Sequence, residues 1–275
     1  MVNNRSIYIW GGIFLLAVDR SIVKDNIFDG NGGIGAPAIL LLGLEEDKIE
    51  ETTIKGNKIV NSGRSAIDAT HTVNLSIYRN IIQDNIGHGL DISNSELGII
   101  ENNKIMGNLW GIKLDEGSHH TIKDNIIKDN VGPGIFFNGI SDSFVIGNRI
   151  TNNSDYWGVG LAGDSILNII EGNYIQNHEL GIFIFEEAES NMIYNNYLNN
   201  SINAEIDNIL MNFWNIVDTP GKNIVGGPYL GGNYWANPDG TGYSQTCESS
   251  HGDGICDEPY VLNENNVDYL PLTLN

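Results

Sequence analysis

The sequence predicts an all-β protein, a right-handed parallel β-helix in which short strands wind into stacked coils. A phrase of about 22 residues recurs along most of the chain, apolar residues alternate within it, and asparagines return at fixed places in each copy. Alternation with a period of two places the apolar side chains on one face of a strand, whereas a helical repeat would space them by three and four residues.

Each copy starts with a small residue and an apolar-x-apolar strand, and it continues to apolar-x-x-Asn-x-Ile and a second asparagine. We expect about nine coils of roughly 22 residues within residues 1–210. Their starts are Gly12, Ala38, Ala66, Gly89, Gly111, Gly134, Gly160, Gly181 and Ala204. Longer spacings indicate insertions near residues 30–35, 43–48 and 153–159.

The recurrent asparagines are interpreted as structural. The corners of a β-helix need left-handed backbone, which asparagine tolerates, and amides stacked one coil apart can hydrogen-bond in a ladder. The histidines His119, His120 and His178 are expected in loops or at strand edges.

The two ends of the solenoid are expected to differ. The alternation is present within the first ten residues with no capping helix before it, and an uncapped end exposes strand edges. We therefore expect an upstream domain or a partner to cover the N-terminal coil. Residues 211–275 leave the repeat and are rich in Gly, Pro and aromatic residues, so they are expected to form an irregular C-terminal cap.

The charge balance excludes several partners. Lys plus Arg total 14 against 35 Asp plus Glu, which gives a formal net charge of −21. Such a surface repels nucleic acid and anionic membranes, and no apolar run approaches the roughly 20 residues that span a bilayer. Neither nucleic acid binding nor membrane insertion is expected.

The outward residues of the first strand in each coil carry the candidate chemistry. The first outward column contains Asp68, Asp91, Lys113, Phe136 and Ala162, and the second contains Asp115, Asn138 and Asp164. Two carboxylates on neighbouring coils, about 4.8 Å apart, cannot both ionise freely, so one pKa should rise. A glycosidase uses such a pair, one acid to protonate the leaving oxygen and the other as nucleophile or base.

The candidate catalytic residues are therefore Asp68, Asp91 and Lys113. Lys113 and Arg64 could also neutralise a uronate, with His88 or Lys113 as the base of a β-elimination. The candidate substrate-binding residues lie on the same face or at its edges, and the aromatic ones would stack on sugar rings. They are Arg64, His71, His88, Asp115, Trp110, Asn138, Phe136, Tyr156 and Trp157.

The two cysteines, Cys247 and Cys256, lie nine positions apart in a Gly-rich segment. In a reducing compartment they would be free thiols. Their close spacing within an irregular segment favours a disulfide that staples a loop, which indicates export.

The last quarter of the chain carries a family resemblance. TPGKNIVGGPYLGGNYW at residues 219–235, HGDGICDEPY at 251–260 and NVDYLPL at 266–272 resemble a segment of archaeal surface proteins with β-helix repeats. These include the NosD-type periplasmic proteins and the disaggregatase-associated domains of methanogens, which do not share one activity. The resemblance implies an exported, cell-surface protein, and for the disaggregatase relatives a matrix polysaccharide as target.

In such relatives the Gly-Asp-Gly stretch belongs to a calcium loop with further aspartates, and glycine stands where this chain has Cys256. The resemblance leaves two alternatives for this loop. Calcium could be held by Asp253, Asp257 and Asp239, or a Cys247–Cys256 disulfide could replace the metal as the staple.

Residues and resemblance together favour an extracellular or cell-surface protein that acts on a polysaccharide, with no cofactor required. A glycoside hydrolase is the first hypothesis. A non-catalytic glycan-binding module is an alternative, because an acidic protein must place carboxylates on its outer face and stacked Asp and Lys can simply balance one another. A polysaccharide lyase or epimerase is another. Assistance in metal-site assembly, suggested by the NosD resemblance, is least favoured because Met and His are sparse.

Overall fold

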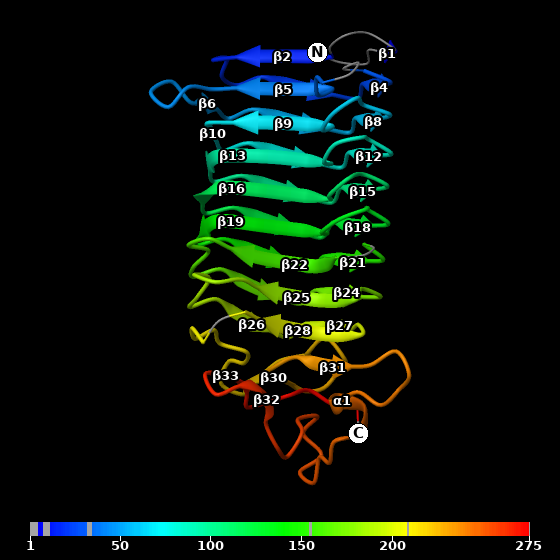
Figure 1. The fold of residues 1–275 in the computed structure, drawn as a ribbon, viewed down its shortest axis with the longest axis vertical. Helices are drawn as coiled ribbons and strands as arrows, with labels where there is room; N and C mark the ends of the chain where they lie inside the picture. Colours follow the sequence, from blue (N-terminus) through cyan, green and yellow to red (C-terminus); the bar gives the residue numbers. More distant parts are fainter. Residues whose placement is uncertain (1–4, 8–11, 32–34, 154–155, 208, 275) are drawn as a thin grey trace.

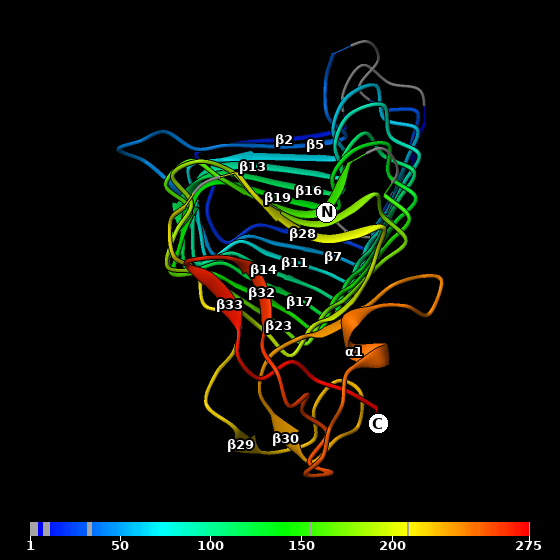
Figure 2. The same ribbon diagram turned by 60° about the horizontal axis from the view of Figure 1, so that its bottom comes forward.

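The computed structural model describes residues 5–7, 12–31, 35–153, 156–207 and 209–274. Within them the chain forms an elongated stack of coils, and each coil contributes one short strand to each of three parallel sheets, named A, B and C here (Figure 1). Seen obliquely from the C-terminal end, the three sheets enclose the core and the C-terminal residues lie across the last coil (Figure 2). The predicted parallel β-helix is confirmed.

Sheet C holds the first strand of each coil. Its strands are β2 (Ile13–Leu16), β5 (Ile39–Leu42), β9 (Ile67–Thr70), β13 (Leu90–Glu96), β16 (Ile112–Ser118), β19 (Ile135–Ser141), β22 (Trp157–Ala162), β25 (Leu180–Ile184) and β28 (Ile202–Ile206), with β6 (Ile49–Glu50) and β10 (Thr72–Val73) at one side.

Sheets A and B follow in each coil. Sheet A comprises β3 (Ile22–Lys24), β7 (Thr53–Lys55), β11 (Ser76–Tyr78), β14 (Ile99–Glu101), β17 (Thr121–Lys123), β20 (Phe144–Ile146), β23 (Ile169–Glu171) and β26 (Met192–Tyr194). Sheet B comprises β1 (Arg5–Ile7), β4 (Ile27–Asp29), β8 (Lys58–Val60), β12 (Ile81–Gln83), β15 (Lys104–Met106), β18 (Ile126–Lys128), β21 (Arg149–Thr151), β24 (Tyr174–Gln176), β27 (Tyr197–Asn199) and β31 (Tyr234–Ala236).

The last coil is completed by the cap. β28 continues sheet C, Phe213 bridges to Met192 at the edge of sheet A, and β31 pairs with β27 in sheet B. The other cap elements are β29 (Thr219–Pro220), β30 (Tyr229–Leu230), α1 (Tyr243–Thr246), β32 (Tyr260–Asn263) and β33 (Asn266–Asp268). The Cys247–Cys256 disulfide is present here, with its Cα atoms 5.7 Å apart, so the stapled loop is confirmed.

One predicted insertion is visible as a projecting loop. Leu44 and Asp47 form an antiparallel bridge between β5 and β6, and the loop extends from the edge of sheet C (Figure 1). The predicted insertions at 30–35 and 153–159 include residues 32–34 and 154–155, which lie outside the described residues.

The core is a stack of aliphatic side chains. Register pairs Ile67 with Leu90 and Leu90 with Ile112, and all three are fully buried. Alternate residues of each strand face outward, so inward apolar columns alternate with outward columns, with one inward column in the three-residue strands of sheets A and B and two in sheet C.

Nine asparagines form a ladder at the corner between sheets A and B. They are Asn26, Asn57, Asn80, Asn103, Asn125, Asn148, Asn173, Asn196 and Asn233. Each Nδ2 donates to the Oδ1 of the next rung at 2.9–3.0 Å, and the backbone N–H of the same residue donates to that oxygen as well. The structural role predicted for the asparagines is confirmed.

Only part of the predicted reason is correct. The left-handed backbone falls on the residue before each rung from Asn26 to Asn196, such as Asp25, Arg79 and Asn102, and not on the ladder asparagine itself. The ladder position is therefore specified by the amide, which supplies a donor and an acceptor on one buried side chain.

Two histidines belong to the ladders at the other corners. His120 and His178 lie between strands, as predicted, but they are buried and act as rungs, which was not predicted. His178 is buried between Asn153, whose Nδ2 lies 3.2 Å from its Nε2, and Asn200, whose Oδ1 lies 3.0 Å from its Nδ1. His120 Nδ1 accepts from the backbone N–H of Gly98. Burial lowers the pKa of both to about 4, and a neutral imidazole can replace an amide because it carries one donor and one acceptor.

The cap hairpin provides the final acceptors of two ladders. Asp268 Oδ2 accepts from the backbone N–H of Asn233 at 2.7 Å and from Trp235 Nε1 at 2.8 Å. Asn266 Oδ1 accepts from the backbone N–H of Asn212 at 3.0 Å and from Trp214 Nε1 at 3.1 Å. The cap therefore continues the hydrogen bonding of the coils, which would otherwise end in unpaired buried donors.

We expect Asn103→Ala to lower the free energy of unfolding by roughly 3 kcal/mol, because it removes the acceptor of the Asn80 backbone N–H, one of the acceptors of Asn80 Nδ2 and the donor to the buried carbonyl of Ile77. Urea denaturation followed by circular dichroism measures this. Asn102→Gly is the matched control, since Asn102 is exposed at φ 55° and glycine adopts that backbone without strain. Equal loss in both variants would contradict the role of the ladder.

Burial raises the pKa of Asp268 from its ordinary value of 3.8 to about 7, although the bonds from Asn233 and Trp235 act in the opposite direction. Its contribution to stability is fully present below about pH 4 and is lost as the pH rises through about 7, by roughly 4 kcal/mol. We expect the stability difference between the wild type and Asp268→Asn to fall over this range. The depressed pKa values of His120 and His178 cancel in that difference, and a pH-independent difference would refute the assignment.

Candidate functional site

The predicted column of ionisable residues is assembled on the outward face of sheet C. Asp91 lies in register with Asp68 on one side and with Lys113 on the other, and Lys113 lies in register with Phe136. The three candidate catalytic side chains therefore stand on successive strands, β9, β13 and β16. All three are partly exposed, so a ligand on this face can reach them.

Ion pairs connect the column to its neighbours. Arg64 Nη2 lies 3.3 Å from Asp68 Oδ2, and Lys113 Nζ lies 3.5 Å from Asp91 Oδ1. Lys113 also pairs with Asp115, whose Oδ1 accepts a hydrogen bond of 3.0 Å from Asn138 Nδ2. These contacts form two groups, Arg64 with Asp68 and Lys113 with Asp91, Asp115 and Asn138, which the register of Asp68 with Asp91 places side by side. We call these six residues the sheet C cluster.

Burial and neighbouring charges shift the pKa values of Asp68 and Lys113. Burial raises the pKa of Asp68, the negative charge of Asp91 adds to the increase, and Arg64 and Lys113 oppose it. For Lys113, burial alone would lower the pKa, but its bonds to Asp115 and the charge of Asp91 outweigh burial and raise it. Lys113 is thus held protonated, which makes it unsuited to the role of base that the sequence left open.

His88 borders the cluster and is neutral near pH 7. Burial lowers its pKa, while Asp91 acts to raise it. Its Nδ1 is buried and has no hydrogen-bond partner within the described part of the chain. The ring lies 4.7 Å from the ring of Trp110.

A row of aromatic side chains continues from His88 along the side of sheet C where its strands begin. Ring centroids are separated by 5.4 Å between Trp110 and Phe136, by 6.3 Å between Phe136 and Trp157, and by 5.3 Å between Trp157 and Phe183. Phe185 packs 4.2 Å from Phe183. Phe183 and Phe185 were not among the predicted site residues, although Phe183 occupies an outward position of β25 and Phe185 follows the end of that strand.

Two positions of the predicted columns, both in one coil, were wrong. Phe136 pairs with Gly160, not Ala162, and Asn138 pairs with Ala162, not Asp164. The coil therefore begins two residues earlier than its sequence suggested. The absence of a side chain at Gly160 has a local effect, since a Cβ there would collide with the indole of Trp157.

Two predicted binding residues lie away from the sheet C cluster. His71 stands at the opposite, C-terminal edge of the sheet, where it lines a pocket of about 360 Å³ with Glu45, Lys48, Glu96 and Glu116 among others. Tyr156 is exposed and touches the aromatic row only through Trp157, at 5.5 Å. The pocket beside His71 was not predicted, and its signal was the insertion at 43–48.

The chain matches the family described as periplasmic copper-binding protein (NosD), in overlapping segments covering residues 1–108 and 42–240. It belongs to the NosD family. This confirms the NosD-type resemblance of the sequence. No curated protein matches the chain. Among the described residues of this NosD-family chain, no helix is both long and apolar enough to cross a membrane.

Solved structures with a similar fold include two mutants of the periplasmic alginate epimerase AlgG. One has a TM-score of 0.58 and 18% identity, covering 82% of this chain and 57% of that structure. The other has a TM-score of 0.55 and 18% identity, covering 67% and 48%. The chain thus spans about half the length of these structures, and at this identity the likeness shows the fold alone.

The family description names copper, and the described residues do not fit a copper site. No group of three His, Cys, Asp or Glu side chains in the described ranges is arranged to hold a metal ion, and the soft sulfur ligands of both cysteines are used in the disulfide. The calcium expected at Asp253, Asp257 and Asp239 stays a prediction. Their carboxylates accept from the backbone N–H of Ile255, Ser250 and Thr241 respectively.

We expect Asp91→Asn to lower the pKa of His88 further, because the charge that favours the imidazolium is removed, and Lys113→Met to raise it. NMR titration of the histidine rings measures both shifts. His178, buried in its ladder, is the internal control and should keep its pKa near 4. An unchanged His88 titration in both variants would show that the three groups are not coupled.

Proposed function

We propose that the chain hydrolyses glycosidic bonds of a polysaccharide bound along the outward face of sheet C. The observation that carries this proposal is the pairing of Asp68 with Asp91 on neighbouring strands, in surroundings that raise the pKa of Asp68. Two carboxyl groups on adjacent strands stand about 5 Å apart, close to the separation that retaining glycosidases use.

In this proposal Asp68 is the general acid that protonates the leaving oxygen. Its raised pKa favours the protonated form compared with an ordinary aspartate, as a general acid requires. Asp91 attacks the anomeric carbon, and water activated by Asp68 then releases the sugar. Lys113, held protonated between Asp91 and Asp115, orients Asp91 through its 3.5 Å contact.

The aromatic row would hold the sugar rings. Trp110, Phe136 and Trp157 form a continuous apolar strip on the same face, with Phe136 one strand beyond Lys113, and flat aromatic faces suit the apolar faces of pyranose rings. Arg64 is exposed at the end of the cluster, so a substrate carboxylate can reach its guanidinium. The preferred polymer in this proposal therefore contains uronate residues.

A second candidate reaction, elimination or epimerisation of a uronate, is favoured by His88. The neutral, half-buried imidazole of His88 at the border of the cluster can remove the C5 proton while Arg64 or Lys113 neutralises the adjacent carboxylate. Departure of the C4 oxygen then yields an unsaturated sugar, and return of a proton from the other face yields the epimer. The similar structures include alginate epimerases, which supports carrying this alternative.

We also propose an envelope or extracellular location. The family description is periplasmic, and a disulfide such as Cys247–Cys256 persists in oxidising compartments.

We expect Asp68→Asn and Asp91→Asn each to lower kcat for release of reducing ends from polygalacturonate or alginate by about 10³-fold. Glu205→Gln is the matched control, because Glu205 lies in the same outward column beyond Phe183 and is exposed. Full cleavage by both aspartate variants would rule out the proposed hydrolysis.

The same assay separates the alternatives. Unsaturated products or deuterium uptake at C5 in heavy water, lost in His88→Gln and retained in Asp68→Asn, would replace hydrolysis by the second candidate. Saturable binding without any product would reduce the site to a glycan-binding surface.

A further inference from the structure

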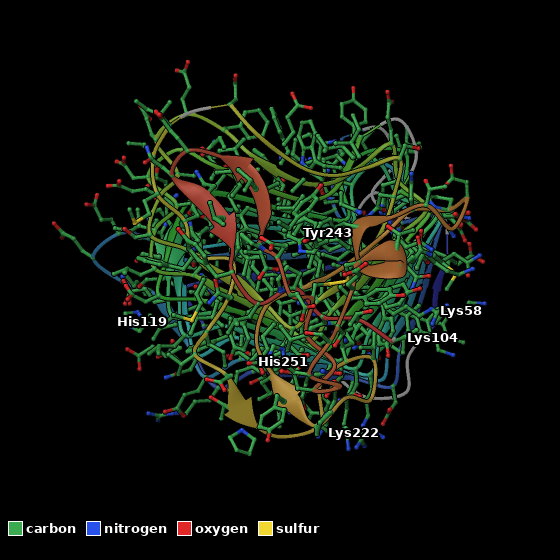
Figure 3. All side chains as sticks on the ribbon, turned by 90° about the horizontal axis from the view of Figure 1, so that it is seen from below. Lys58, Lys104, His119, Lys222, Tyr243 and His251 are labelled. Carbon is green, nitrogen blue, oxygen red and sulfur yellow. A yellow bond between two sulfur atoms is a disulfide. The ribbon has the colours of Figure 1, made fainter. Side chains whose placement is uncertain are left out.

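A column of cations runs along the outward face of sheet B, away from the sheet C cluster. Register places Lys58, Ile81, Lys104, Ile126 and Arg149 side by side on successive strands from β8 to β21. We call these five residues the basic column. Viewed along the helix axis, Lys58 and Lys104 project from the same side of the solenoid (Figure 3).

The cations of the basic column are exposed and available. None of Lys58, Lys104 and Arg149 has a carboxylate within ion-pair distance in the described ranges, whereas Lys123 and Lys128 nearby are paired with Asp124 and Asp129. The column stands out because the chain carries 35 acidic and only 14 basic residues.

Carboxylates are scarce within the strands that carry the column, although Asp84, Asp124 and Asp129 stand at the corners on either side of it. In strands β4 to β27 of sheet B, Asp29 is the one acidic residue that the structure describes, and it lies beside Val60 rather than Lys58. Lys55 adds a further cation across the corner from Lys58. Asp124 and Asp129 are paired with Lys123 and Lys128, and screening confines the field of more distant acids to about 8 Å at physiological ionic strength. The three cations of the column therefore outnumber the unpaired carboxylates beside them.

We propose that the basic column binds an acidic polysaccharide chain that runs parallel to the helix axis. Successive cations are two coils, about 9.6 Å, apart. Ile81, which is 40% exposed, and Ile126 lie between them and offer apolar contact to sugar rings. A polyuronate ribbon in which every second sugar turns its carboxylate to the same side matches this alternation of charged and apolar positions.

The spacing disfavours nucleic acid. Duplex DNA carries one charge per about 1.7 Å of its axis, far denser than a column of three cations, and the net charge of −21 opposes such a polyanion.

The cap sets the end of this surface. Beyond Arg149 the column continues as Tyr174, Tyr197 and Tyr234, whose rings pack 5.5 Å and 4.9 Å apart. Tyr174 Oη donates to the carbonyl of Ile224 at 3.2 Å, and Tyr234 is buried. The tyrosines therefore serve cap docking, and the binding surface is restricted to strands β8 to β21. This inference is independent of the reaction proposed for sheet C.

The test compares two triple variants with equal net charge. Lys58→Gln/Lys104→Gln/Arg149→Gln removes the basic column, and Arg20→Gln/Lys48→Gln/Lys222→Gln removes three cations elsewhere. Binding to immobilised polygalacturonate is measured at several salt concentrations, with dextran and oligothymidylate as probes for neutral glycan and nucleic acid. Thermal unfolding midpoints of both variants confirm that they fold.

We expect the column variant to bind polygalacturonate about tenfold more weakly than the control variant, with the slope of log K against log salt reduced by about 2. Equal affinity of the two variants would overturn the proposal. The proposal would also be overturned if oligothymidylate bound as tightly as polygalacturonate. The same holds if the column variant lost dextran binding as much as it lost polygalacturonate binding. Because binding is read without turnover, the result does not depend on whether sheet C is catalytic.

Discussion

The buried amide ladders are the constraint on which the rest of the structure depends. Each rung between sheets A and B donates twice to the next and also returns a hydrogen bond to a backbone carbonyl of the coil before, as Asn103 does to Ile77. A slip of one residue would leave these groups unpaired in an apolar interior, which is costly. Coils are therefore stacked in strict register, and side chains about 22 residues apart become neighbours.

Because of that register, the outward side chains of each sheet form columns, and the residue at each position sets the charge or polarity of its column. On sheet C it places Asp68, Asp91 and Lys113 together and sets the aromatic row beside them. On sheet B the same geometry alternates cations with isoleucine. The two faces thus differ in composition but share one lattice, which suits recognition of another periodic polymer.

The cap solves the problem that a ladder must end. Asp268 and Asn266, both on β33, accept the last donors of two ladders, and Trp214 and Trp235 cover the open core. A regular coil could not do this, because it would only present a new set of unpaired groups. The irregular tail follows from that requirement, with the disulfide closing the loop between α1 and β32.

The sequence by itself determined the β-helix, most of the outward columns and the disulfide, because a two-residue alternation and a repeated asparagine leave few other folds. It could not place Gly160, since a shift of two residues preserves the alternation and only the pairing with Phe136 distinguishes the registers. The sequence also could not show that His178 is a rung of a ladder, or that His71 lies on the side of sheet C opposite the aromatic row. The charges that decide chemistry, a protonated Lys113 and a neutral His88, come from burial and neighbours that exist only after the coils have stacked.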